Sequence, residues 1–463
     1  MADETSVQAA EAAMMDEDRE LGTAPIKSLF PKYTFTTLVG MGAQAIMVIL
    51  EGIFIGNGLG DHGLGVVGII MPLEYINLAI GAALTMGVAT AVGNRLGEGD
   101  VAGAKRAFNV GFWLTTILNV ILAIIFFLGA ERLALLFGAT PDLLEDSTAV
   151  LRIFAVWFPF LEIGQMLCGM LRVDEKPGLS SAIMTVSAIV AAAWLWFGIF
   201  VLGKGNMAMG NYYGASIGLW AIAIFWFVGN RGTFNIGSPE FDGSLIAEII
   251  KIGLPSFCVQ VVSTIYATVV NNELGIFGGD QASLQIAAFA LLSGYVTYIV
   301  NMMWQCAQYA VQPIASYNYG AKSWGRLKEL LKTMTIDTII LVAVVSAIFI
   351  VFARPVMSVF AGGSEELVEL GTANTLPMII LGCVGCLPSL LSTYYQSVEK
   401  IVPSVIMGVL RYLVLAIPAM LIMTKALGVN GVWWSMPVVD GLAGAIAIIF
   451  IVREMRELSQ KEA

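Results

Sequence analysis

Seven ionisable side chains lie inside long apolar stretches of this sequence, where a charge is costly. They are Glu51, Glu74, Glu162, Glu273, Asp337, Arg411 and Asp440. A carboxylate in such a place is a candidate for function, because it can take up and release a proton or Na⁺. Four of the acids are therefore predicted to be ion-coupling residues: Glu51, Glu74, Glu162 and Glu273. The alternative is a carboxylate that reaches water at an interface or that only holds two helices together.

Arg411 and Asp440 predict a different role from that of the four glutamates. Arg411 lies about 14 residues from one end of its apolar stretch, and Asp440 about 11 residues from the adjoining end of the next. At about 1.5 Å of helical rise per residue, their depths agree to within about 5 Å. Neighbouring antiparallel helices could then join them in a structural ion pair, which avoids an uncompensated buried charge. Asp337 has no evident partner.

Amides and hydroxyls in the apolar stretches suggest a wet cavity. Glu74 and Asn77 share a helical face with Gly81 and Thr85, and Gln165 follows Glu162 at a spacing of three. A second face is continuous over four helical turns and carries Tyr298, Asn301, Gln305, Gln308 and Gln312. The residues predicted to line a substrate cavity are Asn77, Gln165, Tyr298, Asn301, Gln305 and Gln308. Hydrogen bonds between helices are the open alternative.

The elements that carry these residues are membrane-spanning helices. Of the 463 residues, 58% are apolar and 13% charged, about half the charge of a soluble protein. This composition excludes a soluble enzyme, a nucleic-acid binder and a disulfide-rich secreted domain. Apolar runs long enough to span a membrane predict an all-α protein with twelve transmembrane helices. The predicted spans are 28–57, 63–93, 107–129, 143–173, 178–203, 209–229, 246–278, 282–313, 327–352, 366–396, 402–425 and 429–452.

The basic residues predict the orientation of these helices. With the N-terminus in the cytoplasm, 18 Lys and Arg residues fall in cytoplasmic segments and 5 on the outer side. Both termini are therefore predicted to be cytoplasmic. Residues 1–25 are acidic and are expected to form a disordered tail. The five cysteines lie in apolar segments and do not predict a metal site. No cofactor is expected either.

The sequence divides into two similar halves. The longest internal polar segment, 230–245, is predicted to link a six-helix bundle of 26–229 to a second of 246–453, with a short tail of 454–463. Residues of the second half repeat those of the first at an offset of about 223, as in Pro31 and Pro255, or Glu175-Lys176 and Glu399-Lys400. Because each half has six spans, the repeat is parallel, and the cleft between the halves is the expected place for a substrate.

Several of these segments resemble the multidrug and toxic compound extrusion (MATE) family, in its MepA-like bacterial branch. The resemblance is carried by 51–56 (EGIFIG), Met71-Pro72, 97–106 (GEGDVAGAKR), 248–255 (EIIKIGLP) and 312–322 (QPIASYNYGAK). It implies a pair of six-helix bundles that exports amphiphilic, often cationic compounds in exchange for Na⁺ or H⁺. It also implies the plasma membrane of a bacterium as the location and a coupling acid at Glu51. The family's Asn and Asp in the fifth helix are absent from 189–197 (IVAAAWLWF), which favours H⁺.

Four functions remain open at this point. The first is an antiporter for amphiphilic small molecules, acting as a monomer among membrane lipids, with H⁺ or Na⁺ as coupling ion. The second is a flippase of lipid-linked precursors, although Arg411 is the only cation in mid-span. The third is an intramembrane enzyme, suggested only by Gly214-Ala-Ser-Ile-Gly218 within a helix, with the single histidine, His62, in a loop. The fourth is a passive channel. The antiporter is the favoured reading, and no catalytic residue is predicted.

Overall fold

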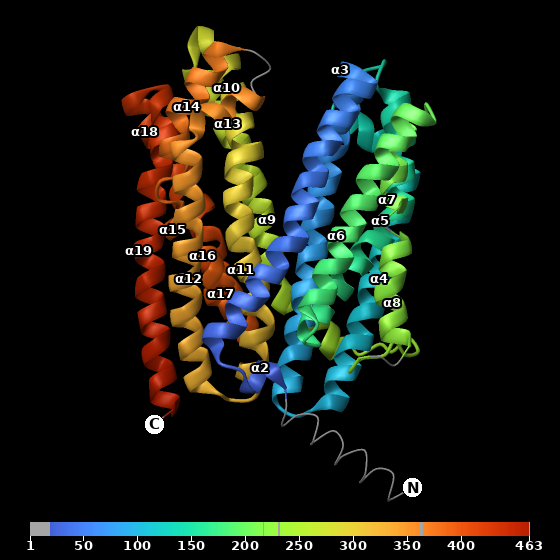
Figure 1. The fold of residues 1–463 in the computed structure, drawn as a ribbon, viewed down its shortest axis with the longest axis vertical. Helices are drawn as coiled ribbons and strands as arrows, with labels where there is room; N and C mark the ends of the chain where they lie inside the picture. Colours follow the sequence, from blue (N-terminus) through green and yellow to red (C-terminus); the bar gives the residue numbers. More distant parts are fainter. Residues whose placement is uncertain (1–18, 216, 230–231, 361–363, 463) are drawn as a thin grey trace, which may run out of the picture. The chain divides into compact units, whose positions relative to one another are not determined.

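The computed structural model describes residues 19–462, apart from 216, 230–231 and 361–363. Every regular element among these residues is a helix (Figure 1). The chain divides into two compact units. The N-terminal unit comprises 35–253 together with the described residues up to Thr23, and the C-terminal unit comprises 24–34 and 254–462.

The N-terminal unit contains the first six predicted spans. Its central helix is α5, which is the most buried of its spanning helices because its own aromatic and aliphatic side chains, such as Phe154 and Phe158, pack into the core of the unit. Apolar side chains on the outer faces, such as Leu128, are exposed, as expected for surfaces in contact with lipid. The elements are α2 (Glu20–Thr23), α3 (Ile26–Gly97), α4 (Val101–Leu136), α5 (Leu144–Val173), α6 (Pro177–Trp196), the π-helix η1 (Phe197–Val201), α7 (Met207–Ala215) and α8 (Ile217–Val228).

A single glycine separates the first two predicted spans. The sequence predicts a break between 57 and 63, but α3 runs through both spans and only Gly60 has a non-helical backbone, with φ 64° and ψ −156°. A positive φ of this kind is readily adopted only by glycine. The chain therefore turns at Gly60, and Glu51 and Glu74 lie on opposite sides of the turn.

The C-terminal unit contains the remaining six spans. Its most buried helix is α16, in which every residue is buried. The elements are α9 (Gly243–Phe277), the 3₁₀-helix η2 (Gly279–Gln281), α10 (Ala282–Leu291), the π-helix η3 (Leu292–Thr297), α11 (Tyr298–Gly320), α12 (Trp324–Val351), α13 (Ala353–Phe360), α14 (Glu365–Ile379), α15 (Gly382–Gly385), α16 (Leu387–Ser397), α17 (Ile401–Val409), the π-helix η4 (Leu410–Ala416), α18 (Ile417–Leu427) and α19 (Val429–Glu462).

The number of spanning helices agrees with the sequence. Ten helices in the described part of the chain are long and apolar enough to cross a membrane, and the bent pair Glu365–Ile379 and Gly382–Ser397 adds an eleventh if it counts as one span. Helices α7 and α8 lie in the predicted sixth span. The predicted architecture is thus confirmed: an all-α membrane protein of twelve transmembrane helices in two six-helix bundles.

The internal repeat is visible in matching hydrogen bonds inside each unit. Ser180 Oγ donates to the carbonyl of Cys168, and Ser404 Oγ donates to the carbonyl of Ser392, and the partners are 12 positions apart in both cases. Glu175 and Glu399 both have a positive φ, of 61° and 58°. Equivalent residues of the two halves are therefore 224 positions apart in this region, since 404 − 180 = 224.

The unit boundaries differ from those expected from the sequence. Residues 24–34 pack with the C-terminal unit and 243–253 with the N-terminal unit. Arg326 Nη2 donates to the carbonyl of Ala24 over 2.8 Å in the C-terminal unit. In the N-terminal unit Arg95 holds both carboxylate oxygens of Glu248, at 2.7 and 2.9 Å. Hydropathy could not show this exchange, because it depends on tertiary contacts at the helix ends.

The N-terminal segment is also more ordered than predicted where the structure describes it, and the C-terminal tail is helical. Residues 1–18 of the predicted tail lie outside the described residues. Leu21, however, is buried in the short helix α2, and its N–H donates to Glu175 Oε1 over 2.7 Å. At the other end α19 continues to Glu462, and buried Glu454 accepts a hydrogen bond from Lys400 at 2.6 Å. These partners give both segments a reason to fold.

The close approach of α9 to α3 predicts a sharp difference between two glycines of α9. A Cβ at Gly253 would lie 2.3 Å from the carbonyl oxygen of Ala83, a backbone atom that cannot rotate away, whereas a Cβ at Gly275 meets nothing within 4 Å. Gly253→Ala should therefore lower stability by about 1–3 kcal/mol through overpacking. Gly275→Ala is the matched control and should leave stability unchanged or slightly higher. Thermal unfolding of the purified protein in detergent measures both, and equal melting temperatures would contradict the packing of α9 on α3.

Candidate functional site

Glu162 is a buried acid within a membrane-spanning helix of the N-terminal unit. It lies on the central helix α5 with 5% of its surface exposed, and Asn77 Nδ2 of α3 donates to its Oε1 over 2.9 Å. The other oxygen, Oε2, occupies the space beside Gly81, where a Cβ would lie only 1.6 Å away. A glycine at 81 is thus what allows the carboxylate to enter between α5 and α3.

Glu162 has no cation to balance it among the residues that the structure describes, where its one polar partner is the amide of Asn77. The amide oxygen of Asn77 is itself buried and makes no hydrogen bond. An asparagine can donate from its nitrogen to a carboxylate or, after rotating, accept at its oxygen from a carboxylic acid. The pair can therefore accommodate Glu162 with or without a bound proton. The two carboxylate oxygens of Glu162 and the amide oxygen of Asn77 are also ligands of the kind that hard cations prefer.

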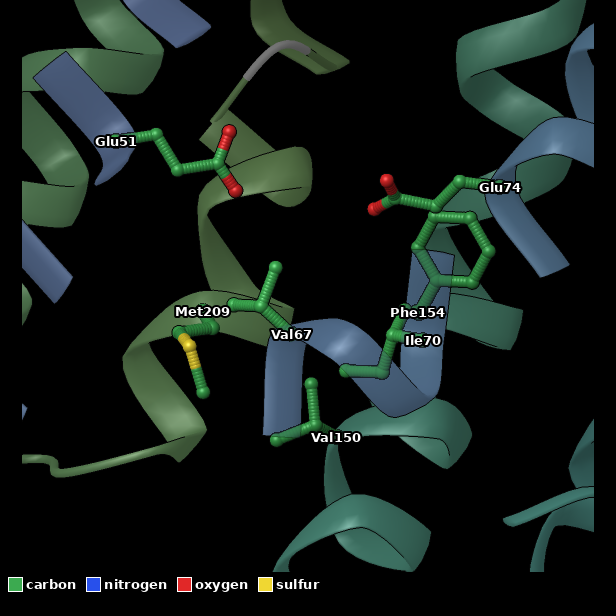
Figure 2. Close-up of a pocket in the computed structure, with 7 residues that line it drawn as sticks. All are labelled: Glu51, Val67, Ile70, Glu74, Val150, Phe154 and Met209. Carbon is green, nitrogen blue, oxygen red and sulfur yellow. The ribbon is translucent and has the colours of Figure 1, made fainter. Parts of the chain in front are cut away.

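Glu51 and Glu74 line a second, smaller site in the same unit. Figure 2 shows their carboxylates pointing toward one another across a cavity. The walls are apolar and come from α3, α5 and α7: Val67, Ile70, Val150, Phe154 and Met209. The centre of a water molecule has about 20 Å³ available to it, and one water needs about 10–15 Å³. The cavity therefore has room for a water or a small ion, but not for an organic substrate.

In the C-terminal unit Arg411 and Asp440 lie together as a buried ion pair. Arg411 Nε is 2.7 Å from Asp440 Oδ1, and Nη2 is 3.1 Å from Oδ2. The exposed fractions of the two side chains are only 4% and 1%. The parallel two-bond geometry is the strong form of an arginine–carboxylate contact. Glu273 is buried as well, and its Oε2 accepts a hydrogen bond from Thr424 over 2.7 Å.

The predicted cavity residues do not form one set within either unit. Gln308 Nε2 donates to the carbonyl of Ser389, which is the interhelical bonding that the sequence left open. Asn77 donates a hydrogen bond to Glu162. Other predicted residues have varied surroundings: Tyr298 and Gln305 are exposed, Gln165 is half-buried, and half-buried Asn301 has an amide oxygen without a partner. Asp337 is half-buried on α12.

Sequence reasoning missed two features of these sites. The pairing of Asn77 with Glu162 was not foreseen, although Gly81, four residues beyond Asn77, was the available signal for a close approach. The rings of Trp304 and Tyr412 against Arg411 were also missed, because aromatic residues are too numerous in this chain to be diagnostic. Ser216 of the Gly-x-Ser-x-Gly motif lies outside the described residues. His62, the single histidine, lies 2.8 Å from Asp146.

The glycine at 81 gives a prediction that separates ion binding from folding. In Gly81→Ala the new methyl group displaces the flexible end of Glu162, so the protein should fold while the affinity of this carboxylate for a proton or a metal cation changes. We expect a change of about tenfold in this affinity, which corresponds to about 1.4 kcal/mol. Gly68→Ala on the same helix meets nothing within 4 Å and is the control. Ion-dependent thermal unfolding measures both variants, and an unchanged ion effect in Gly81→Ala would contradict this geometry.

A multi-pass protein built from two similar helical bundles, with acids inside its spans, belongs to the class of membrane transporters. The family model MatE matches residues 37–197 and 254–422. The chain therefore belongs to the MatE family of multidrug-export transporters.

Individual relatives agree with this assignment. The chain is 22% identical over 458 residues to the multidrug export protein MepA of Staphylococcus aureus (strain bovine RF122 / ET3-1), covering 95% of this chain and 97% of the relative. It is 23% identical over 431 residues to MepA of Staphylococcus haemolyticus, covering 92% of each. Among solved structures, an outward-facing multidrug resistance MATE family transporter of the MOP superfamily has a TM-score of 0.87 at 19% identity, covering 95% of this chain and 98% of that one. A MOP superfamily transporter from Pyrococcus furiosus has a TM-score of 0.88, also at 19% identity and with the same coverage.

Proposed function

We propose that this transporter is a secondary antiporter that exports amphiphilic organic cations in exchange for H⁺, with Na⁺ as the alternative coupling ion. The observation that carries the proposal is the buried carboxylate of Glu162, which has an amide partner and no balancing cation among the described residues. The relatives named MepA, which are multidrug export proteins, support the substrate class.

The N-terminal unit supplies the exchange chemistry in this proposal. Glu162 takes up the ion from one side of the membrane and releases it to the other. The cavity between Glu51 and Glu74 in the same unit can hold a water molecule or the ion during this passage. Ion binding lowers the affinity for the organic substrate, and substrate binding lowers the affinity for the ion by the same factor. Alternating access then follows from a change in the arrangement of the two units, with both termini in the cytoplasm.

The nature of the site favours a proton over a metal ion. A proton needs one carboxylate, whereas a metal cation is held by several oxygen ligands. Among the described residues, only three oxygen ligands are available at this site: the two of the Glu162 carboxylate and the amide oxygen of Asn77. The flippase alternative has less support, since a pyrophosphate group calls for unpaired basic residues and Arg411 is already bound to Asp440.

The test is transport by the purified protein in liposomes. We expect an imposed pH gradient to drive efflux of a fluorescent organic cation when Na⁺ is absent from both sides. A Na⁺ gradient at uniform pH should drive none. The reverse result would assign Na⁺ as the coupling ion. Efflux at the same rate without any ion gradient would contradict the antiporter and favour a passive channel.

A further inference from the structure

The two halves of the chain carry their buried carboxylates at different positions. Counting 224 positions on from Glu162 leads to Cys386, so the C-terminal unit lacks the equivalent carboxylate on its own chain segment. Asp440 supplies one from another helix, because its Oδ1 lies so close to Gly385 that a Cβ there would be 2.3 Å away. The carboxylate of Asp440 thus lies beside the position that corresponds to Glu162.

The amide is repeated as well. Asn301 is 224 positions after Asn77, and in both residues the amide oxygen is buried without a hydrogen-bond partner. Each unit therefore has a buried carboxylate in this region and an asparagine at the equivalent place on the second helix of the repeat. The feature that differs is the base: Arg411 in the C-terminal unit corresponds to Ser187 in the N-terminal unit.

Arg411 lies in surroundings suited to a monovalent cation. Its Cζ is 5.0 Å from the ring centre of Trp304 and 5.1 Å from that of Tyr412, within the range of cation–π contacts. Tyr412 also accepts a hydrogen bond from Nη1 at its hydroxyl, over 3.1 Å. Two rings and one carboxylate form what we call the cation cage: Trp304, Tyr412 and Asp440.

The backbone of η4 puts two of these residues in place. Arg411 and Tyr412 are consecutive in a π-helix, a rare conformation that often marks functional sites. The ring of Tyr412 packs at 5.1 Å on that of Tyr266, whose hydroxyl donates to Met436 Sδ over 3.0 Å. The cage is therefore braced from α9 and α19 as well as from its own segment.

We propose that Arg411 is a resident cation that permanently fills the cation cage, so that Asp440 exchanges no ion and Glu162 of the N-terminal unit is the exchanging acid. The second part of this statement rests on the proposed function. Arg411 remains charged at any physiological pH and is part of the chain. It therefore balances the negative charge of Asp440 permanently, whereas an exchangeable ion would balance it only while bound.

The experiment removes the tethered cation in a background without Glu162. The variant Glu162→Gln/Arg411→Ala is unfolded thermally in detergent, at fixed ionic strength and pH, with increasing millimolar guanidinium chloride or sodium chloride. We expect its melting temperature to rise by several degrees with one of these cations, because a ligand that binds only the folded state stabilises it. Glu162→Gln alone should show no such rise. The triple variant that adds Asp440→Asn removes the carboxylate of the cage and should show none either.

The outcomes test the resident cation and the proposed antiport function independently of each other. A double variant without any cation-dependent rise, or an equal rise after Asp440→Asn, would overturn the resident cation. If the double variant does not fold, the neutral pair Arg411→Met/Asp440→Asn decides. Its melting temperature should depend on the coupling ion as the wild type does, and loss of that dependence would show that Asp440 binds an exchanging ion. By contrast, an undiminished ion dependence in Glu162→Gln alone would contradict the proposed function.

Discussion

Glu162→Gln should reduce gradient-driven efflux to the rate seen without a gradient, because the change in substrate affinity on ion binding, typically about 5- to 150-fold, is lost. Glutamine has nearly the shape of a protonated glutamic acid and keeps a hydrogen-bond partner for Asn77, so the helices should pack as before. It cannot release a proton, however, and its affinity for substrate should become independent of pH. Efflux from liposomes and substrate binding between about pH 5 and pH 8 measure the two effects.

Two controls separate this prediction from a general loss of charge. Glu131→Gln removes an exposed acid near the end of α4 and should leave efflux unchanged. Glu162→Asp keeps an acid but draws it back from Asn77, so it should retain part of the coupled transport. If Glu162→Gln transports at the wild-type rate and with the wild-type pH dependence, Glu162 is not the exchanging acid. The Glu51–Glu74 cavity would then be the next candidate.

Asp440→Asn should lower stability by about 3–5 kcal/mol, the usual effect of removing one partner from a buried ion pair. Asparagine is almost isosteric with aspartate, so the loss comes from the buried guanidinium that is left without a counter-charge rather than from a cavity. The 3% exposure of Arg411 means that water cannot compensate for that charge. Expression level and thermal unfolding in detergent measure the effect.

Removing both charges should restore most of this stability. In Arg411→Met/Asp440→Asn no charge remains buried, and neutral replacements of buried ion pairs are often well tolerated. A double-mutant cycle with the two single variants gives the interaction energy directly. Additive single effects would show that the two side chains do not depend on each other, in disagreement with hydrogen bonds of 2.7 and 3.1 Å between them.

Much of this architecture is encoded in local sequence. A membrane-spanning helix satisfies its own backbone hydrogen bonds, so a run of about 20 apolar residues is enough to predict it. The repeat was equally accessible, because pairs such as Glu175 and Glu399 keep their spacing along the chain. The similar depths of Arg411 and Asp440 followed from helical rise alone. Each of these inferences needs only the chain's own periodicity.

Tertiary structure decided which polar groups meet. Asn77 and Glu162 are 85 positions apart, on α3 and α5, and hydropathy contains no information about their rotation toward one another. The turn at a single residue, Gly60, and the exchange of helix ends between the units depend on contacts that form only in the folded chain. The sequence determined which side chains must be buried in the membrane, and packing determined that Glu162 would have no counter-charge among the described residues while Asp440 has Arg411.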